Sequence, residues 1–556
     1  MRLYKLLLVM ACLAIAVIPV LAQQVVRGPY LQIGSSSSII VRWRTDVATD
    51  SRVRYGTSQG SLSDAAEDTR QTKEHELALA GLSANTMYYY SIGTSSTSLA
   101  GGDAAHFFVT SPLSGSGKPT RIWILGDSGT ANSSSRAVRD AYYDFTGTRH
   151  TDLWLMLGDN AYSKGKDEEY QAAVFENMYE EMLRKSVLWP TLGNHDDGAS
   201  STPGPYPYYD IFSLPKNGEA GGLASGTEAY YSFDYGDIHF ICLNSATNDL
   251  RSSSSAMWVW LEEDIAANDK SWTIAFWHHP PYSKGSHDSD SDSELKEMRA
   301  RAVPLLEEGG IDLVLSGHSH SYERSFLVDS HYGKSGSLSN DMIIDAGDGR
   351  DDGDGSYRKG TLGPGAHEGS IYLVNGSSGK TSGGSLDHPI MVHSYKELGS
   401  VVLDIDGNRL DATFINDKGV RRDYFSIIKG ATNVGPPDRL AEIAGNNQTG
   451  NVGQTLALPF VVQVKDASGN PVPGVAVTFE IATGNASLSN SQPRITSSSG
   501  RASTTLTLGS EPGEYVVTVS ASGLAGSPIK FVATAVGQNA GAPAPPTNVR
   551  VVVSSD

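Results

Sequence analysis

The chain has 556 residues, more than one hydrophobic core organises, so we expect several domains. Its formal net charge is −19 at pH 7, and the acidic residues are spread along the sequence, which argues against nucleic acid as a structural partner. A site for an anionic ligand in such a chain needs metal ions or a few local basic residues as its source of positive charge.

Residues 1–22 have the pattern of a secretory signal peptide. Arg2 and Lys5 precede a long apolar run, and we expect cleavage after Ala22. A membrane anchor is the alternative, because the apolar run approaches the length that spans a bilayer. Cleavage ahead of Cys12, as in a lipoprotein, fits less well, since the apolar run continues past this cysteine. We therefore expect a secreted, periplasmic or cell-surface protein with no transmembrane span after cleavage.

Removal of residues 1–22 would leave Cys242 as the single cysteine, so no intramolecular disulfide is expected. Cys242 lies in the alternating run DIHFICLN, where the simplest interpretation is a small buried hydrophobic residue.

Residues 25–112 are predicted to form a β-sandwich. Short alternating or aromatic-rich runs, such as SIIVRWRT, MYYYSIGT and AHFFVTS, are divided by Gly, Ser and Asn turns. A linker rich in Ser, Gly and Pro follows, and the pattern changes at about residue 118.

Residues 118–428 are predicted to form an α/β core. Short apolar strands alternate with segments of helical period, for example RIWIL with SRAVRDAYYDF, and LWLML with DEEYQAAVFENMYEEMLRK. Beyond residue 325 the pattern returns to strands and carries a Gly/Asp-rich insertion. The core is therefore expected to hold its strands between helical layers.

Residues 437–537 read as a second β-sandwich, because LPFVVQVKDASGNPVPGVAVTFEIA, GRASTTLTL and GEYVVTVSA contain no helical segment. Residues 538–556 form a Pro/Ala-rich linker and tail.

Within the α/β core, chemically capable side chains recur directly after the predicted strands. The strands end in Asp127, Asp159, Asn194–His195, His278, and the pair His318 and His320. Open α/β sheets place their ligands outside the carboxyl ends of their strands. Any one of these residues alone would be an ordinary loop residue or helix cap, but the combination predicts one common site.

The donor types of this site indicate a metal centre. Carboxylate and amide oxygens with imidazoles suit Fe, Mn or Zn, and the cysteine content excludes a thiolate site. The donors are too many for one tetrahedral zinc ion, whereas two ions sharing a carboxylate would use them all. Such a pair, about 3.5–4 Å apart, is the arrangement used for phosphoryl displacement.

Five ordered motifs in this core resemble those of the calcineurin-like metallophosphoesterases. They are GDSG from Gly126, GDNAY from Gly158, GNHD from Gly193, WHHPPY around His278, and GHSH from Gly317. Tyr162 and the sequence SYERS after His320 narrow the resemblance to the purple acid phosphatases. That family has a β-sandwich core flanked by helices and commonly an N-terminal fibronectin type III-like domain, which residues 25–112 resemble. Residues 437–537 resemble a bacterial immunoglobulin-like domain of the invasin/intimin kind.

The resemblance implies a ligand set. Asp127, Asp159, Tyr162 and His320 would hold the first ion, and Asp159 would bridge to a second ion held by Asn194, His278 and His318. Two carboxylates and a phenolate suit Fe³⁺ in the first site, and the neutral donors of the second suit Zn²⁺, Mn²⁺ or Fe²⁺. His279, next to His278, could exchange roles with it, but the family pattern favours His278.

The family activity implied is acid hydrolysis of small phosphomonoesters to an alcohol and inorganic phosphate, by in-line attack of a hydroxide held by the two metals. His195 matches the substrate-contacting histidine of the family, and His287 lies in the loop where the family places another. A solvated loop histidine is an equally good interpretation of His287. Both are retained as catalytic candidates.

Two other functions stay open. The same centre could act on phosphodiesters or nucleotides, because the five motifs specify phosphoryl transfer and not the leaving group. A surface adhesion protein with a vestigial phosphatase core is an alternative from another class, suggested by the two flanking sandwiches. The C-terminal sandwich is more simply a spacer or a module for attachment to the cell surface.

Three further segments are interpreted without a function. The acidic loops 287–294 and 345–355 could bind Ca²⁺, but neither has EF-hand spacing, and solvated loops are the simpler interpretation. Residues 375–384, NGSSGKTSGG, lack the strand–helix context of a phosphate-binding loop and are predicted to be turns.

Overall fold

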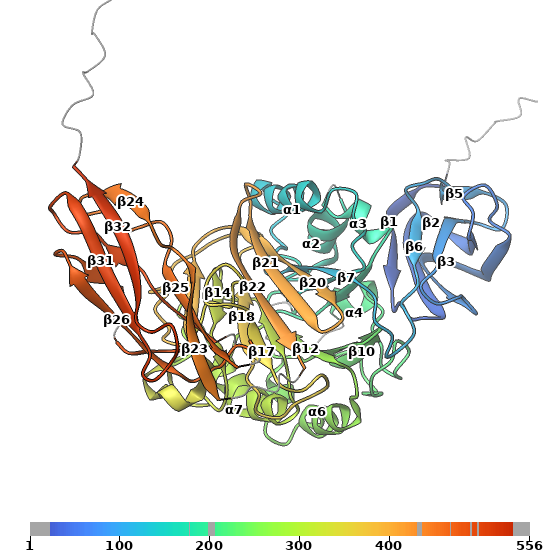
Figure 1. The fold of residues 1–556 in the computed structure, drawn as a ribbon. Coiled ribbons are helices and arrows are strands. Elements are labelled where there is room, and N and C mark those ends of the chain that lie inside the picture. The colour runs from blue at the N-terminus through green and yellow to red at the C-terminus, as the bar shows by residue number, and fades with distance from the viewer. Residues whose placement is uncertain are drawn as a thin grey trace, which may run out of the picture.

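A computed structural model describes residues 23–537, apart from residues 177, 198–205, 431–435, 468, 490–491 and 498–499. The predicted signal peptide and the tail 538–556 lie outside the described residues. None of the helices in the described part combines the length and the apolar character that a membrane span requires. The chain forms an N-terminal β domain, a central core of two sheets with helices, and a C-terminal β domain (Figure 1). The predicted fold class is confirmed.

The N-terminal domain is a six-stranded antiparallel sheet. Its strands are β1 (Val25–Gln32), β2 (Ser38–Gly56), β3 (Asp64–Ala80), β4 (Met87–Gly93), β5 (Ser98–Gly101) and β6 (Phe107–Val109). The long strand β2 pairs with β1, β3 and β4, and its register with β3 breaks between Arg44 and Ser51. His75 is buried and stacks on Trp43 at 4.6 Å between ring centroids.

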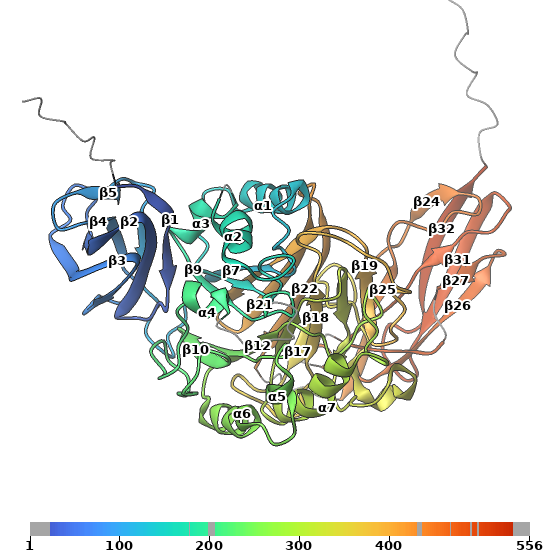
Figure 2. The same cartoon turned by 180° about the vertical axis from the view of Figure 1, so that it is seen from behind.

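The N-terminal domain and the central core share one hydrophobic cluster. β1 makes the junction: Tyr30 donates to the carbonyl of Ile211, and Gln32 donates to that of Leu188. Arg27 and Arg44 both pair with Asp167 of the core. Buried aromatic residues and ion pairs therefore fix the N-terminal domain against the core. Figures 1 and 2 show the two domains side by side.

Two seven-stranded sheets form the central core. The first has the order β10 (Tyr231–Tyr235), β11 (Ile238–Cys242), β12 (Trp272–Trp277), β13 (Leu313–Ser316), β18 (Ile371–Asn375), β14 (Tyr322–Ser325), β19 (Met391–Tyr395). The second has the order β17 (Tyr357–Lys359), β22 (Arg421–Lys429), β21 (Arg409–Asn416), β20 (Gly399–Asp406), β7 (Thr120–Leu125), β8 (Leu153–Met156), β9 (Val187–Pro190). β11, β12, β13 and β18 run parallel, as do β7, β8 and β9. Both parallel runs are fully buried, as strands covered on two faces should be.

Helices lie on the two outer sides of this pair of sheets. On one side are α1 (Ser133–Thr146), α2 (Asp167–Tyr170) and α3 (Glu180–Leu183), and on the other are α6 (Ala256–Ala267) and α7 (Ser293–Glu308) (Figure 1). α4 (Pro207–Ile211), α5 (Asn248–Arg251), the π-helical turn η1 (Gln171–Phe175), the 3₁₀ turns η2 (Ser335–Ser337) and η3 (Asn340–Met342), and the pair β15 (Leu327–Val328) and β16 (Ile343–Asp345) complete the core.

The helical segment predicted from DEEYQAAVFENMYEEMLRK is broken. The chain forms α2, then η1, then an extended Glu176, and resumes as α3. Tyr170, Phe175 and Tyr179 are all buried. The Gln171 side chain accepts a hydrogen bond from Arg27 Nε and donates one to the carbonyl of Val26. Burial of these large rings and the contact with β1 outweigh the helical preference of the sequence.

The C-terminal domain has its own hydrophobic cluster. One sheet contains β23 (Pro437–Ala444), β25 (Phe460–Asp466) and β29 (Arg501–Thr504). A second sheet contains β24 (Gln448–Asn451), β32 (Ile529–Val536), β31 (Gly513–Ser520), β26 (Ala476–Thr483) and β28 (Arg494–Ile495). A short pair is formed by β27 (Ser487–Leu488) and β30 (Leu506–Thr507).

This domain rests on the acidic loop 345–355. Arg501 donates to the carbonyl of Asp351, Ser497 donates to that of Asp354, and Ser503 donates to the Asp354 carboxylate. Asp354 is only 9% exposed, so this part of the loop is an intramolecular contact and not the solvated loop that the sequence suggests. The opposite side of the loop meets the core, where Arg324 donates to the carbonyl of Asp348.

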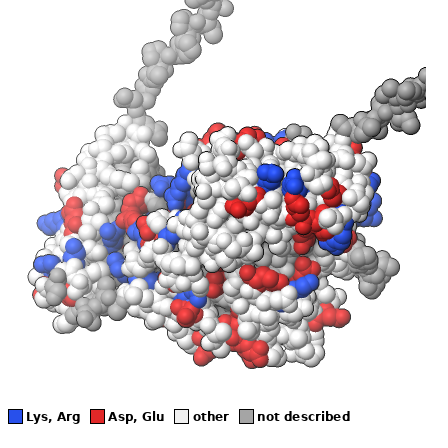
Figure 3. Space-filling model, turned by 90° about the vertical axis from the view of Figure 1, so that its right-hand side faces the viewer, with Lys and Arg blue, Asp and Glu red and all other residues white. Residues whose placement is uncertain are grey.

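The surface carries charged side chains of both signs. On the face drawn in Figure 3, acidic and basic side chains of the described residues are interspersed and form no continuous basic stripe.

His239 lies in a buried ion-pair cluster, and its contribution to stability is expected to depend on pH. Its Nδ1 lies 2.8 Å from Asp234 Oδ1 and its Nε2 lies 2.9 Å from Asp264 Oδ2. Burial lowers the pKa of His239, but the two carboxylates outweigh it and raise the pKa to about 9. Because the folded pKa exceeds the unfolded value of about 6.5, the contribution is complete below that pH and is lost as pH rises through about 9.

We therefore expect the free energy of unfolding to fall by up to about 3 kcal/mol between pH 6 and 10 through this group, a figure that converts its pKa shift. Thermal denaturation across that range checks this. His239→Gln should be less stable at pH 6 and should have a flatter profile. An unchanged slope in the variant would show that other groups produce the dependence.

Candidate metal centre

The carboxyl ends of the two parallel runs meet at one place. Asp127 follows β7 and Asp159 follows β8 in one sheet, while His278 follows β12 and His318 follows β13 in the other. A glycine precedes three of them, and close packing explains why. A Cβ on Gly158 would lie 2.5 Å from His278 Nδ1, and one on Gly317 would lie 2.6 Å from Asp127 Oδ2. The Gly-Asp and Gly-His pairs therefore let the two sheets bring their strand ends together.

Three of these side chains sit on strained backbone. Asp127, Asp159 and His318 have φ angles of 55°, 52° and 65°, which residues with a Cβ rarely adopt. Hydrogen bonds stabilise this backbone conformation. The amide of Asp127 donates to the Gly158 carbonyl, and the amide of His318 donates to Asp127 Oδ2 at 2.7 Å. Strain of this kind is typical of functional sites, where the surroundings over-determine the geometry.

Tyr162 joins the two carboxylates. Its hydroxyl lies 3.0 Å from Asp127 Oδ1 and 2.8 Å from Asp159 Oδ2. His320 Nε2 is 3.4 Å from Asp127 Oδ1 on the same side. Burial and the two carboxylates raise the pKa of Tyr162 far above its usual value, so without a bound cation the phenol keeps its proton. The structure thus brings together Asp127, Asp159, Tyr162 and His320.

The second group of donors surrounds His278. Its Nε2 lies 3.0 Å from Asn194 Oδ1, 3.2 Å from His318 Nδ1 and 3.3 Å from Asp159 Oδ1. Its Nδ1 bonds to the carbonyl of Leu157, which leaves Nε2 directed at these neighbours. Asn194, His278, His318 and Asp159 therefore also converge.

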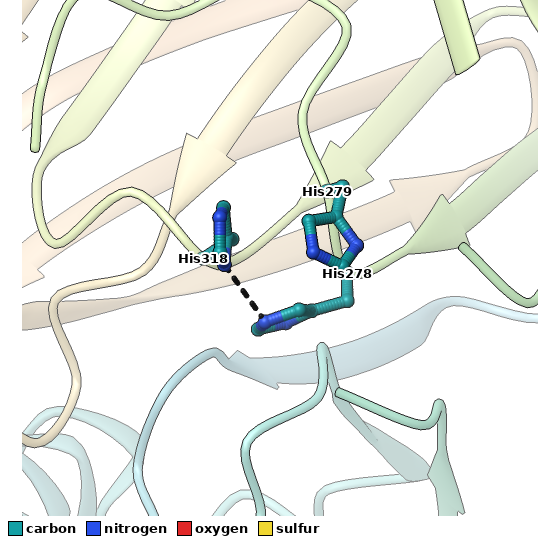
Figure 4. A group of neighbouring side chains, drawn as sticks. All are labelled: His278, His279 and His318. Carbon is teal, nitrogen blue, oxygen red and sulfur yellow. Dashed lines mark hydrogen bonds between the residues drawn. The ribbon is translucent and has the colours of Figure 1, made fainter. Parts of the chain in front are cut away.

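Figure 4 shows how the three neighbouring histidines lie. The dashed line joins His318 Nδ1 to His278 Nε2. His279 Nδ1 instead lies 3.0 Å from Ser245 Oγ. The donor atoms of all three nevertheless lie within 4.8 Å of one another. His278, which also faces Asp159, is the better placed of the adjacent pair for a shared centre.

These residues fit a pair of metal ions. Asp127 and Asp159 are 0% and 1% exposed. Among the described residues, the ion-pair partners of these two carboxylates are histidines, and no lysine or arginine neutralises them. Two buried carboxylates that share one phenol proton need additional positive charge. Carboxylate, phenol and amide oxygens with imidazoles are the donors that iron, manganese and zinc accept.

Both predicted catalytic histidines lie at this centre. His195 Nδ1 is 2.8 Å from the carbonyl of Ser163, and its ring packs on Tyr162 at 4.7 Å between centroids. His195 Nε2 lies 4.0 Å from Asp159 Oδ2. The His287 ring packs against that of His318 at 3.7 Å between centroids, tilted by 31°, and His287 Nδ1 is 3.0 Å from Asp292 Oδ2. Asp292 belongs to the acidic loop 287–294, which the sequence analysis left without a function.

Sequence reasoning missed Asp196, the last residue of GNHD. Its fully buried carboxylate accepts hydrogen bonds from Tyr170 Oη at 2.7 Å, from the amide of Gly193 at 2.8 Å, and from the Asn160 amide and side chain. It thus ties the loop after β8 to the loop after β9. The signal available in the sequence was an acidic residue directly after Asn194 and His195.

Three segments of the chain match family models. Residues 26–110 match the purple acid phosphatase N-terminal domain, residues 120–322 match the calcineurin-like phosphoesterases, and residues 445–535 match the bacterial Ig-like domain (group 1).

Individual relatives agree with these matches. Purple acid phosphatase 15 of Arabidopsis thaliana is 28% identical over 281 residues, which cover 46% of this chain and 50% of that protein. Purple acid phosphatase 18 of the same plant is 27% identical over 324 residues, 54% of this chain and 66% of that protein. The alignments thus span about half to two thirds of these relatives. Purple acid phosphatase PPD1 from yellow lupin (Lupinus luteus) seeds has a similar structure, with a TM-score of 0.56, 18% identity, and coverage of 73% of this chain and 75% of that one.

Proposed function

We propose that this chain is an exported acid phosphatase that hydrolyses phosphomonoesters, because residues 120–322 match the calcineurin-like phosphoesterases and follow a segment that matches the purple acid phosphatase N-terminal domain. The segment matches support a metal-dependent phosphoesterase with a dinuclear centre. Monoester preference, the metals and export are the further parts of the proposal. Export rests on the signal-like residues 1–22, and the Ig-like domain is compatible with attachment at a cell surface.

The observation that carries the proposal is the position of Tyr162. A phenol directed at two buried carboxylates supplies a third anionic oxygen once it loses its proton. We assign Asp127, Asp159, Tyr162 and His320 to Fe³⁺. We assign the shared Asp159 with Asn194, His278 and His318 to Zn²⁺, Mn²⁺ or Fe²⁺. When bound, such ions supply charge neutralisation for a phosphoryl group and lower the pKa of water.

His195 is placed to bind and orient the substrate. Its Nδ1 lies at hydrogen-bonding distance from the Ser163 carbonyl, and with Nδ1 donating to that carbonyl, Nε2 remains for a phosphoryl oxygen. When protonated, the imidazole adds positive charge beside Asp159, where negative charge grows as the phosphoryl group is transferred.

His287 is placed to deliver a proton. With Nδ1 donating to Asp292, the ring is held against His318 and its Nε2 remains free. From this position a proton on Nε2 can be given to the departing alcohol oxygen. Asp292 is therefore assigned as the residue that positions His287.

Initial rates on p-nitrophenyl phosphate and bis-p-nitrophenyl phosphate test the proposed specificity. We expect the monoester to be hydrolysed faster by the purified, metal-loaded protein. Dominant cleavage of the diester would replace the monoesterase with a phosphodiesterase that uses the same centre. Absence of both iron and turnover would favour a binding protein with a vestigial core.

Tyr162→Phe tests the assignment of the first metal. Phenolate bound to ferric iron absorbs strongly in the visible region, so the wild-type protein should be coloured and the variant should lose the band while other donors still hold iron. The visible spectrum, recorded with the iron content of each sample, checks this. An iron-loaded variant that keeps the band would remove Tyr162 from the ligand set. Tyr143→Phe is the matched control, because Tyr143 lies on α1.

A further inference from the structure

The segment Gly376–Gly384, here called the glycine loop, lies at the metal centre. It follows β18, whose carboxyl end adjoins that of β13. A Cβ on Gly376 would lie 3.0 Å from Asp127 Oδ2, and one on Gly379 would lie 2.5 Å from the carbonyl of Asp127. The loop that the sequence analysis interpreted as simple turns is therefore packed directly on a predicted metal ligand.

Hydrogen bonds fix the glycine loop in this place. The carbonyl of Gly379 accepts from Thr130 Oγ1 and from Asn132 Nδ2, and the amide of Ser378 donates to the carbonyl of Gly126. Ser382 lies 2.9 Å from His320 Nδ1, and its amide donates to the His320 carbonyl. The loop is thus anchored on both sides of Lys380.

Lys380 extends from this loop over the site. Its Nζ lies 3.9 Å from the centroid of the Tyr162 ring, whose hydroxyl points to Asp127 and Asp159. The side chain is half-buried. Among the described residues no hydrogen bond or ion pair is recorded for its ammonium group, although acidic residues are in excess in this chain. His195 packs on the same ring.

The position of Lys380 suits a negatively charged group that lies next to the phosphoryl group at the metal centre. A phosphoryl group bound at the metal centre would lie next to Asp127 and Asp159, and the structure gives Lys380 no ion pair with either carboxylate. Its contact is with the ring of Tyr162, whose hydroxyl bonds to both carboxylates, so its charge lies beside the site and is not used by a carboxylate of it. A lysine ammonium is a flexible point charge that suits a phosphate group.

We propose that Lys380 binds a second phosphate group of the substrate, next to the phosphoryl group that is transferred. This rests on the proposed phosphatase function and deepens it. The substrates concerned carry two neighbouring phosphates, as nucleoside diphosphates do. Lys380 is then a residue that sets specificity, and the glycine loop is the element that presents it.

The test compares ADP with AMP, which differ by one phosphate. We expect Lys380→Gln to lower kcat/KM for ADP by about tenfold or more, because a hydrogen bond to a charged group contributes on that order. For AMP, we expect a loss below about threefold, since the single phosphate is held by the metal centre. Lys380→Arg should keep most of the preference for ADP. Lys73→Gln, an exposed lysine on β3, is the matched control and should change neither value.

The outcomes separate this inference from the proposed function. An equal loss for ADP and AMP in Lys380→Gln would mean that Lys380 only supports Tyr162, and would overturn the inference while leaving the phosphatase intact. Should the metal-loaded wild-type protein hydrolyse neither of these compounds nor p-nitrophenyl phosphate, the proposed function fails. Calorimetric titration with inorganic pyrophosphate then decides: weaker binding to Lys380→Gln than to Lys73→Gln supports the second-phosphate site, and equal binding refutes it.

Discussion

If the proposed function is right, Asp159→Asn is expected to lower kcat for phosphomonoesters by about a thousandfold or more, because the carboxylate proposed to be shared by two ions is lost and two such ions together stabilise a transferred phosphoryl group. Asp159 is the residue on which both donor groups converge. Its Oδ2 is 2.8 Å from the Tyr162 hydroxyl, and its Oδ1 is 3.3 Å from His278 Nε2. An amide has no negative charge to share between two cations, so we expect the content of both metals to fall as well.

Stability measurements distinguish this loss from misfolding. In the wild-type protein, Asp127 and Asp159 are buried with little compensating charge, and metal ions bound to the folded state should raise the melting temperature. Asp159→Asn should melt at or above the temperature of the chelated wild-type protein and should gain little when metals are added. Asp269→Asn, whose side chain is 83% exposed, is the matched control. A variant that binds two metals per chain and keeps its rate would refute the bridging role.

Asp196→Asn is expected to have the second largest effect. The buried carboxylate accepts hydrogen bonds from the Asn160 amide at 3.0 Å, from Gly193 and from Tyr170. Asparagine places an amino group where several donors converge, which leaves donors unpaired and repels them. We expect a loss of about 3 kcal/mol in stability, since buried unsatisfied donors of this kind cost about 1–3 kcal/mol each.

Activity should fall with it, because Asp196 positions the loops that carry Asp159 and Asn194. Removal of such a supporting group typically costs about 10–100-fold in metal affinity or activity. Thermal denaturation and metal titration of Asp196→Asn, alongside the exposed Asp144→Asn on α1, check both effects. Unchanged metal affinity in a destabilised variant would limit Asp196 to a role in folding.

The residues of the candidate centre could be proposed from the sequence because their signals are local. A short apolar run followed by Gly-Asp or Gly-His marks a buried strand and the residue just beyond its end, and such positions gather at one edge of a parallel sheet. The types of donor atom then limited the expected metals to iron, manganese and zinc. The order of the five motifs indicated the resemblance to the calcineurin-like metallophosphoesterases. Asp127, Asp159 and His278 could be proposed as neighbours although they lie far apart in the chain.

Other features depended on contacts that no local pattern contains. The segment 167–183 has helical periodicity, yet burial of Tyr170 and Phe175 and the contact with β1 break it. The acidic loop 345–355 looks solvated, yet the C-terminal domain covers Asp354.

The sequence by itself determined the order of the domains and the positions of the candidate donors after the strands, because these follow from composition and from periodicity over a few residues. Only the tertiary structure showed that Asp196 and Lys380 lie at the candidate centre. Asp196 bonds to Asn160, 36 residues earlier, and the glycine loop bonds to Gly126, 252 residues away. Such contacts depend on the order of strands in two sheets and on close packing between them, which residue patterns along the chain do not specify.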